Sequence, residues 1–234
     1  EGAKVRARYR EVLNSGVAQV DLERAAGPGA AQLVFQYSAR FNENLAGLYR
    51  VRQGADWYAM TQFEPTDARR MFPSFDEPAF KTPFTISITA PAGQVAISNA
   101  LEKTTENLPG GMVRHEFWPT APLPTYLVAL VVGPYDLVEG PVIPASDVRR
   151  AAIPLRGIAV KGKGPQLSYA LSRVAPMVSA LEGYFGTPYP FTKIDVLAAP
   201  SFESGAMENA GLMVFSEPLL LLDVVRPARD RILD

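Results

Sequence analysis

Cysteine is absent from the chain, so disulfide bonds within it are excluded. Histidine occurs once, as His115, and a single imidazole cannot build a metal site that needs two. Long apolar runs are also missing, because the most apolar stretches, at 126–132 and 219–225, fall far short of the ~20 residues of a spanning helix. With 23 basic and 24 acidic residues, neither sign of charge is in excess. This balance gives no indication of a nucleic acid partner or an anionic membrane surface.

Hydrophobic residues make up 47% of the 234 positions, which is enough to bury the core of one large domain or of two smaller ones. Up to about residue 150 the pattern is that of strands separated by Gly and Pro turns. Apolar, alternating or β-branched runs predict strands at 31–37, 84–89, 112–118 and 125–132. Helical periodicity is scarce here, so residues 1–150 are predicted to form a mostly-β domain.

The pattern changes after Pro144. The predicted elements beyond it are a strand at about 153–160, a helix at about 166–184, and strands at 194–199 and 211–215. Pro176 lies inside the predicted helix and is expected to kink it or to leave a carbonyl exposed. Residues 151–234 are therefore predicted to form the start of an α+β domain.

One unusual segment, residues 202–211, places the carboxylate of Glu208 among small and apolar residues between two predicted strands. Gly205 and Gly211 lie on either side of it, and glycine lets a backbone approach a ligand or a neighbouring strand closely. In a partly desolvated cleft, such a carboxylate is a natural partner for an ammonium group. The alternative is a turn at a sheet edge with a solvent-facing glutamate.

A second unusual segment, residues 61–78, contains three prolines and is predicted to be a rigid loop. Glu64 precedes Pro65, which favours an extended backbone for the glutamate. Of the other charged residues of the loop, those interpreted as a structural ion-pair network are Arg69, Arg70, Asp76 and Glu77, and Asp67 is a further carboxylate that could pair with the arginines.

Together these segments resemble the aminopeptidase N family of zinc metallopeptidases. Residues 205–209 match that family's Gly-Ala-Met-Glu-Asn exopeptidase motif letter for letter. A second family signature is matched by Gln-Phe-Glu-Pro-Thr-Asp-Ala-Arg-Arg at 62–70 with Phe-Pro-Ser-Phe-Asp-Glu-Pro at 72–78. A third is matched by Tyr-Phe-Gly and Pro-Tyr-Pro within 184–190. Three matches in the right order are specific, and the resemblance covers nearly the whole chain.

The resemblance implies a mostly-β, saddle-like N-terminal domain followed by the incomplete α+β start of a thermolysin-like catalytic domain. By position in the motifs, Glu208 would bind the free α-ammonium of a peptide substrate. Glu64 would close a two-carboxylate clamp on the same amine. Two negative charges favour a free N-terminus over an internal peptide bond, which has no charge to offer.

The resemblance assigns the neighbouring positions to the rest of the substrate. Gly205 and Ala206 would lie along the substrate backbone, where lack of bulk matters. Met207 and Gln62 would border the pocket for the first side chain, a place that suits the flexible and polarizable thioether of methionine.

A role for zinc is implied only by the resemblance to the family. In that family the metal is held by a His-Glu-x-x-His helix and a further glutamate, downstream of the exopeptidase motif. This chain is therefore expected to be a fragment that begins inside the β domain and ends before that helix. It is predicted to hold no metal and no catalytic residue, and His115 is interpreted as an ordinary strand residue. The expected partners are peptides with a free N-terminus and the remainder of the polypeptide. The full-length protein would be a zinc aminopeptidase, and the fragment alone would be inactive.

Two other classes of protein stay open at this point. A relative that lost zinc but kept the clamp would be a peptide-binding or scaffold module, and a plain β adhesion module would not bring Glu64 and Glu208 together. A branch of the same family that hydrolyses epoxides leaves peptide hydrolysis an expectation. An exported bacterial protein is a hypothesis based on the lack of cysteine, with a cytoplasmic one as the alternative.

Overall fold

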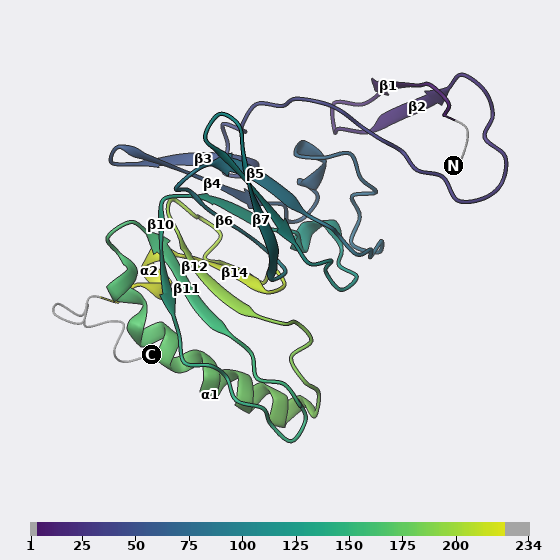
Figure 1. Ribbon diagram of the computed structural model, residues 1–234. Coiled ribbons are helices and arrows are strands. Elements are labelled where there is room, and N and C mark those ends of the chain that lie inside the picture. The colour runs from purple at the N-terminus through teal and green to yellow at the C-terminus, as the bar shows by residue number, and fades with distance from the viewer. Residues whose placement is uncertain (1–3, 223–234) are drawn as a thin grey trace.

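The structure, a computed structural model, describes residues 4–222. The first residues of the first predicted domain and the last residues of the second therefore lie outside the described range. Within that range the strands form a hairpin and three larger sheets (Figure 1). The hairpin consists of β1 (Ala7–Glu11) and β2 (Ala18–Leu22), and nearly all of its residues are exposed.

A four-stranded antiparallel sheet leads into the loop that contains Glu64. Its strands in spatial order are β3 (Gly47–Gln53), β4 (Asp56–Gln62), β9 (Leu130–Gly133) and β6 (Val95–Ser98). Tyr58 and Met60, two residues apart on β4, are both buried, as expected of a strand with one face on a core. Since β4 ends at Gln62, the chain leaves this sheet just before Glu64.

A three-stranded antiparallel sheet packs beside it. Its strands in spatial order are β5 (Ser87–Pro91), β8 (Met112–Phe117) and β7 (Glu102–Leu108). Ile88 and Phe117 share a small core with Leu130 of β9, which ties the two sheets together. Two 3₁₀ turns complete the N-terminal part, η1 (Ala68–Arg70) and η2 (Thr125–Leu127).

A five-stranded mixed sheet follows. Its strands in spatial order are β10 (Tyr135–Glu139), β11 (Leu155–Val160), β12 (Ile194–Ala199), β14 (Leu212–Ser216) and β13 (Ala206–Met207). The central strands β11, β12 and β14 are parallel, and every residue of β12 is buried, the pattern of a strand covered on both faces. The helical segments are η3 (Gly164–Leu167), α1 (Ser168–Phe185) and α2 (Glu217–Leu220).

The mixed sheet has a different cover on each face (Figure 1). On one face α1 contributes Leu171 and Val178 to a core with β11 and β12. On the other face Leu197 and Leu212 belong to the same core as Tyr58 and Met60 of the N-terminal sheet. A mostly-β part followed by an α+β part is therefore confirmed, and the two parts share buried surface.

The domain division at residue 150 stays a prediction. β10 precedes that position and β11 follows it, yet the two pair over residues 135–139 and 156–160. The mixed sheet therefore draws on both predicted domains.

Some of the predicted helices and strands are present in the structure and others are not. The helix is confirmed as α1 and runs through Pro176, and the strands at 153–160, 194–199 and 211–215 correspond to β11, β12 and β14. The strand at 31–37 is wrong, because no regular secondary structure forms there. The strand at 125–132 is partly wrong, since its first half is η2.

Candidate functional site

The two motif segments meet where β4 ends and β13 lies. The Gln62 side chain donates a hydrogen bond from Nε2 to Sδ of Met207 over 3.7 Å, and both residues are buried. A thioether sulfur is a weak acceptor, so this contact contributes little energy itself. It joins positions 145 residues apart in sequence, and it places the loop after β4 next to the exopeptidase motif.

The two predicted clamp glutamates are close in sequence to the residues of this contact. Glu64 follows Gln62 by two residues, Glu208 follows Met207 directly, and both glutamates are exposed. Each glutamate is therefore accessible to a ligand. Joint binding of one amine by the two remains a prediction.

The small residues of the motif have the conformations that their type allows. Gly205 has φ +75°, in the left-handed region, and its carbonyl accepts a hydrogen bond of 2.7 Å from the backbone N–H of Ser216. Ala206 is exposed, and its position on β13 pairs with Phe215 of β14. The backbone ahead of Glu208 is thus held against β14, with little side chain above it.

The loop after Glu64 is organised by a buried aspartate. Asp76 Oδ2 accepts hydrogen bonds from Nε of Arg69 over 2.9 Å and from its backbone N–H over 3.0 Å. Asp76 Oδ1 accepts a third from the hydroxyl of Thr125 over 2.6 Å. Arg70 pairs with Asp67 in the same loop. The interpretation of these charges as structural is confirmed for the two pairs, whereas Glu77 makes no ion pair among the described residues. Glu64 belongs to neither pair.

Asn99, which the sequence did not single out, holds the exopeptidase motif from the N-terminal part. Its Nδ2 donates to the carbonyls of Leu127 over 2.8 Å and Ala210 over 2.9 Å. Its Oδ1 accepts from the N–H of Ala129 over 2.8 Å. The only sequence feature that could have indicated this role is the position of Asn99 directly after strand β6. A short amide side chain at the end of a strand can form hydrogen bonds with the backbone of a neighbouring loop.

Gly211 follows this contact and cannot carry a side chain. Its φ is +71°, and a Cβ on it would overlap the carbonyl oxygen of Asn99. The prediction that glycine here permits close approach of another backbone is thereby confirmed.

Gly211→Ala is expected to lower the free energy of unfolding by about 3 kcal/mol. The left-handed backbone contributes ~1–2 kcal/mol and the overlap with Asn99 ~1–3 kcal/mol. Gly110→Ala is the matched control, since Gly110 has φ +77° and nothing within 4 Å of an added Cβ. Urea unfolding of both variants measures the difference. Equal decreases in the free energy of unfolding would show that the backbone at Asn99 can move to accommodate the added Cβ without loss of stability.

Behind the motif, a buried cation contacts the same glycine. Lys193 Nζ donates to the carbonyl of Gly211 over 2.8 Å and to Oδ2 of Asp195 over 2.6 Å. Arg156 donates from Nε and Nη2 to the two oxygens of Asp195 at 3.1 and 2.9 Å. Burial lowers the pKa of the Lys193 ammonium, and the adjacent Asp195 carboxylate opposes that change.

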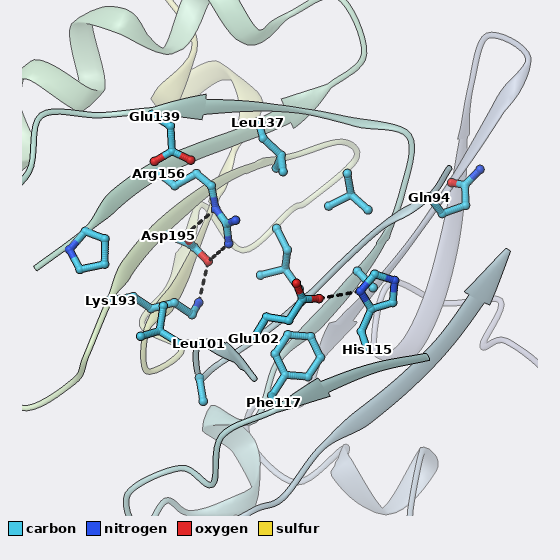
Figure 2. A pocket seen from close by; sticks show the side chains of 15 residues that line it. Gln94, Leu101, Glu102, His115, Phe117, Leu137, Glu139, Arg156, Lys193 and Asp195 are labelled. Carbon is cyan, nitrogen blue, oxygen red and sulfur yellow. Dashed lines mark hydrogen bonds and ion pairs between the residues drawn. The ribbon is translucent and has the colours of Figure 1, made fainter. Parts of the chain in front are cut away.

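These three charges line a cavity of about 500 Å³ between β6 to β8 and β10 to β12 (Figure 2). Figure 2 shows the Glu102–His115 pair on the other side of the cavity, where Glu102 Oε1 and His115 Nδ1 lie 2.6 Å apart. None of the predicted site residues lines it. The cavity is therefore separate from the Gln62–Met207 contact, although Lys193 reaches both the cavity and Gly211.

Metal-binding and membrane-spanning features were sought in the described part of the chain. Across residues 4–222, no group of three or more His, Cys, Asp or Glu side chains could hold a metal ion. His115 lies on β8, and its Nδ1 is 2.6 Å from Oε1 of Glu102. No helix in the described range has the length and apolarity that crossing a membrane requires.

The fold and the motif contact define a class of protein in which a mostly-β N-terminal part is followed by an α+β part, and the two meet at the Gln62–Met207 contact. Residues 4–127 match the sequence model of the peptidase M1 N-terminal domain, and residues 169–232 match that of the peptidase family M1 domain. The chain belongs to the peptidase M1 family. The resemblance to the aminopeptidase N family and the predicted fold class are confirmed.

Curated relatives include enzymes from fungi, plants and animals. The chain is 38% identical to aminopeptidase 2 of Candida albicans over 197 residues, which is 82% of this chain and 20% of that protein. It is 34% identical to aminopeptidase M1-B of Oryza sativa over 231 residues, 92% of this chain and 25% of that protein. It is 37% identical to endoplasmic reticulum aminopeptidase 1 of Homo sapiens over 196 residues, 82% of this chain and 20% of that protein. The chain thus spans between a fifth and a quarter of the length of these relatives.

Proposed function

We propose that this chain is the substrate-amine anchor of a zinc-dependent aminopeptidase, an enzyme that removes N-terminal amino acids from peptides. The observation that carries the proposal is the Gln62–Met207 contact, which joins the two motif segments across the shared core. The names of the relatives, all aminopeptidases, support the same activity.

In this proposal Glu208 and Glu64 bind the α-ammonium of the substrate. Both carboxylates are exposed here, and a peptide lying over them would exclude water and strengthen their attraction to the cation. An N-acylated peptide has no charge at that position and would leave two carboxylates unpaired, so it would bind more weakly.

The neighbouring side chains shape the site for the first residue of the peptide. Met207 and Gln62 are buried beside it, and Oε1 of Gln62 is without a hydrogen-bond partner among the described residues. Gly205 and Ala206 leave room for the substrate backbone.

The residues described here do not fit zinc, since they offer no group of three metal ligands. Zinc, when bound by the full-length protein, supplies a Lewis acid and an activated water. The role proposed for this chain is confined to binding and orienting the free N-terminus. On this proposal the 234-residue chain alone is inactive.

The test compares turnover of aminoacyl p-nitroanilides by this chain and by the full-length protein, each with added zinc. Turnover by the full-length protein alone is expected. Activity of the short chain would contradict the fragment proposal. A folded but silent full-length protein that still binds peptides would instead indicate a non-catalytic peptide-binding or scaffold relative.

A further inference from the structure

The exopeptidase loop is fixed on both sides of Glu208. Before it, Met207 is buried, contacts Gln62 and pairs with Val214 of β14. After it, Asn209 and Ala210 are buried. Glu208 is thus an exposed residue between two buried ones, and the direction of its side chain depends on how each neighbour is held.

The side after Glu208 is held by the N-terminal part of the chain. Asn99 donates to the carbonyl of Ala210, and Asn209 donates from Nδ2 to the carbonyl of Tyr126 over 3.5 Å, a length at the limit for a hydrogen bond. The bond from Asn99 is shorter, at 2.9 Å, and is fully buried. Asn99 is therefore the better-placed of the two amides to determine where the loop lies.

Asn99 is itself rigid, because its three side-chain bonds have fixed directions. One amide hydrogen points to Leu127, the other to Ala210, and the oxygen faces the N–H of Ala129. Its own carbonyl oxygen lies against the Cα of Gly211. A displacement of the loop away from Asn99 would lengthen and weaken the bond to Ala210, and a displacement toward it would press Gly211 on that carbonyl.

We propose that Asn99 is a positioning residue that sets the location of the Glu208 carboxylate and thereby the preference of the enzyme for a free N-terminus. This inference rests on the proposed function. Asn99 touches no substrate; it acts through the backbone of residues 209–211. The hydrogen bond from Asn99 to Ala210 connects the N-terminal sheet to the loop that carries Glu208. The β domain would therefore contribute to the preference for a free N-terminus through Asn99 as well as through Glu64.

The test uses the full-length protein carrying Asn99→Asp. Aspartate has the same shape and still accepts from the N–H of Ala129, but it offers no amide hydrogens to Leu127 and Ala210. The matched control is Ser98→Ala, which removes the buried 2.8 Å hydrogen bond from the Ser98 hydroxyl to the Ala129 carbonyl without touching the motif. Asn99→Ser is a second, milder variant in case the aspartate impairs folding.

Two readouts separate positioning from a structural role. The first is KM and kcat for leucine p-nitroanilide. The second is calorimetric binding of leucine amide and of N-acetyl-leucine amide to the zinc-free protein. In the Asn99 variants KM is expected to rise about tenfold with little change in kcat, and the preference for the free amine to fall about tenfold. Ser98→Ala is expected to change neither.

The outcomes distinguish the inference from the function on which it rests. A lower kcat with unchanged KM and unchanged amine preference in either Asn99 variant would overturn the positioning role, because it indicates only less folded enzyme. The same preference loss in Ser98→Ala would also overturn it. A wild-type protein that binds both amides equally would refute the amine anchor itself, and the inference with it.

Discussion

Glu208→Gln in the full-length protein is expected to lower kcat/KM for free-amine substrates about 100-fold. The substitution keeps the size of the side chain but replaces the charge that faces the substrate ammonium in the proposed clamp. A hydrogen bond between charged groups contributes ~1.5–3 kcal/mol, and ~2.8 kcal/mol corresponds to a factor of about 100. Steady-state kinetics on aminoacyl p-nitroanilides measures the effect.

The control for this experiment lies in the same loop. Glu203 is also exposed and precedes the motif, so Glu203→Gln changes the net charge equally at a place with no proposed contact to the amine. Its kinetics are expected to stay within about twofold of wild type. Comparable losses in the two variants would mean that general charge near the loop, rather than a direct contact at Glu208, attracts the substrate.

Glu64→Gln extends the test to the other side of the clamp. If both carboxylates bind the same ammonium, their effects are coupled, and the double variant loses less or more than the sum of the single losses. Strictly additive losses would place the two glutamates on separate parts of the substrate. Such a cycle therefore tests joint binding of one ammonium group by the two glutamates.

The elements that the sequence predicted well are those whose own residue pattern indicates which side chains are buried. β12 is a short continuous apolar run, and its neighbours cover it on both faces. α1 has an apolar stripe at helical spacing and is followed by Gly186, whose φ of +64° and N–H bond to the Glu182 carbonyl cap the helix. The motif residues were found because short, specific matches need no knowledge of tertiary structure.

The errors arise where a partner elsewhere in the chain decides the outcome. The run at 31–37 has strand-forming residues, but Val34 is 83% exposed, and no neighbouring strand pairs with the segment in the described part of the chain. At 125–132 the hydroxyl of Thr125 bonds to Asp76, and the chain makes a 3₁₀ turn before β9 begins. Asn99 was missed for the same reason, since its partners lie 28 to 111 residues away.

Asp195 is a residue whose loss should affect stability strongly. Its side chain is 3% exposed and neutralises two cations, Lys193, which is also 3% exposed, and Arg156, which is 28% exposed. A buried ion pair is weak evidence of net stabilisation, because desolvation of both partners offsets their attraction. Removing one partner is different, since it leaves a buried charge without compensation.

Asp195→Asn is therefore expected to lower the free energy of unfolding by about 3–5 kcal/mol at neutral pH. Asp147→Asn, at an exposed position, is the control and should change it by less than ~0.5 kcal/mol. Replacing both partners, as in Asp195→Leu with Lys193→Met, should recover part of the loss, because no buried ammonium then remains and Arg156 can turn toward solvent. A double variant no more stable than Asp195→Asn would contradict this account of the cluster.

The dependence on pH follows from the direction of the Lys193 pKa. Burial lowers it below the value in the unfolded chain, and Asp195 opposes that change, so the pKa falls further when the carboxylate is removed. Between the folded and unfolded pKa values the unfolded state binds more protons, which makes stability rise with pH across that window. The deficit of Asp195→Asn relative to wild type should accordingly shrink as pH is raised toward the ordinary pKa of lysine. Urea unfolding of both proteins at several pH values tests this, and a deficit that stays constant or grows with pH would assign the loss to Arg156 instead of Lys193.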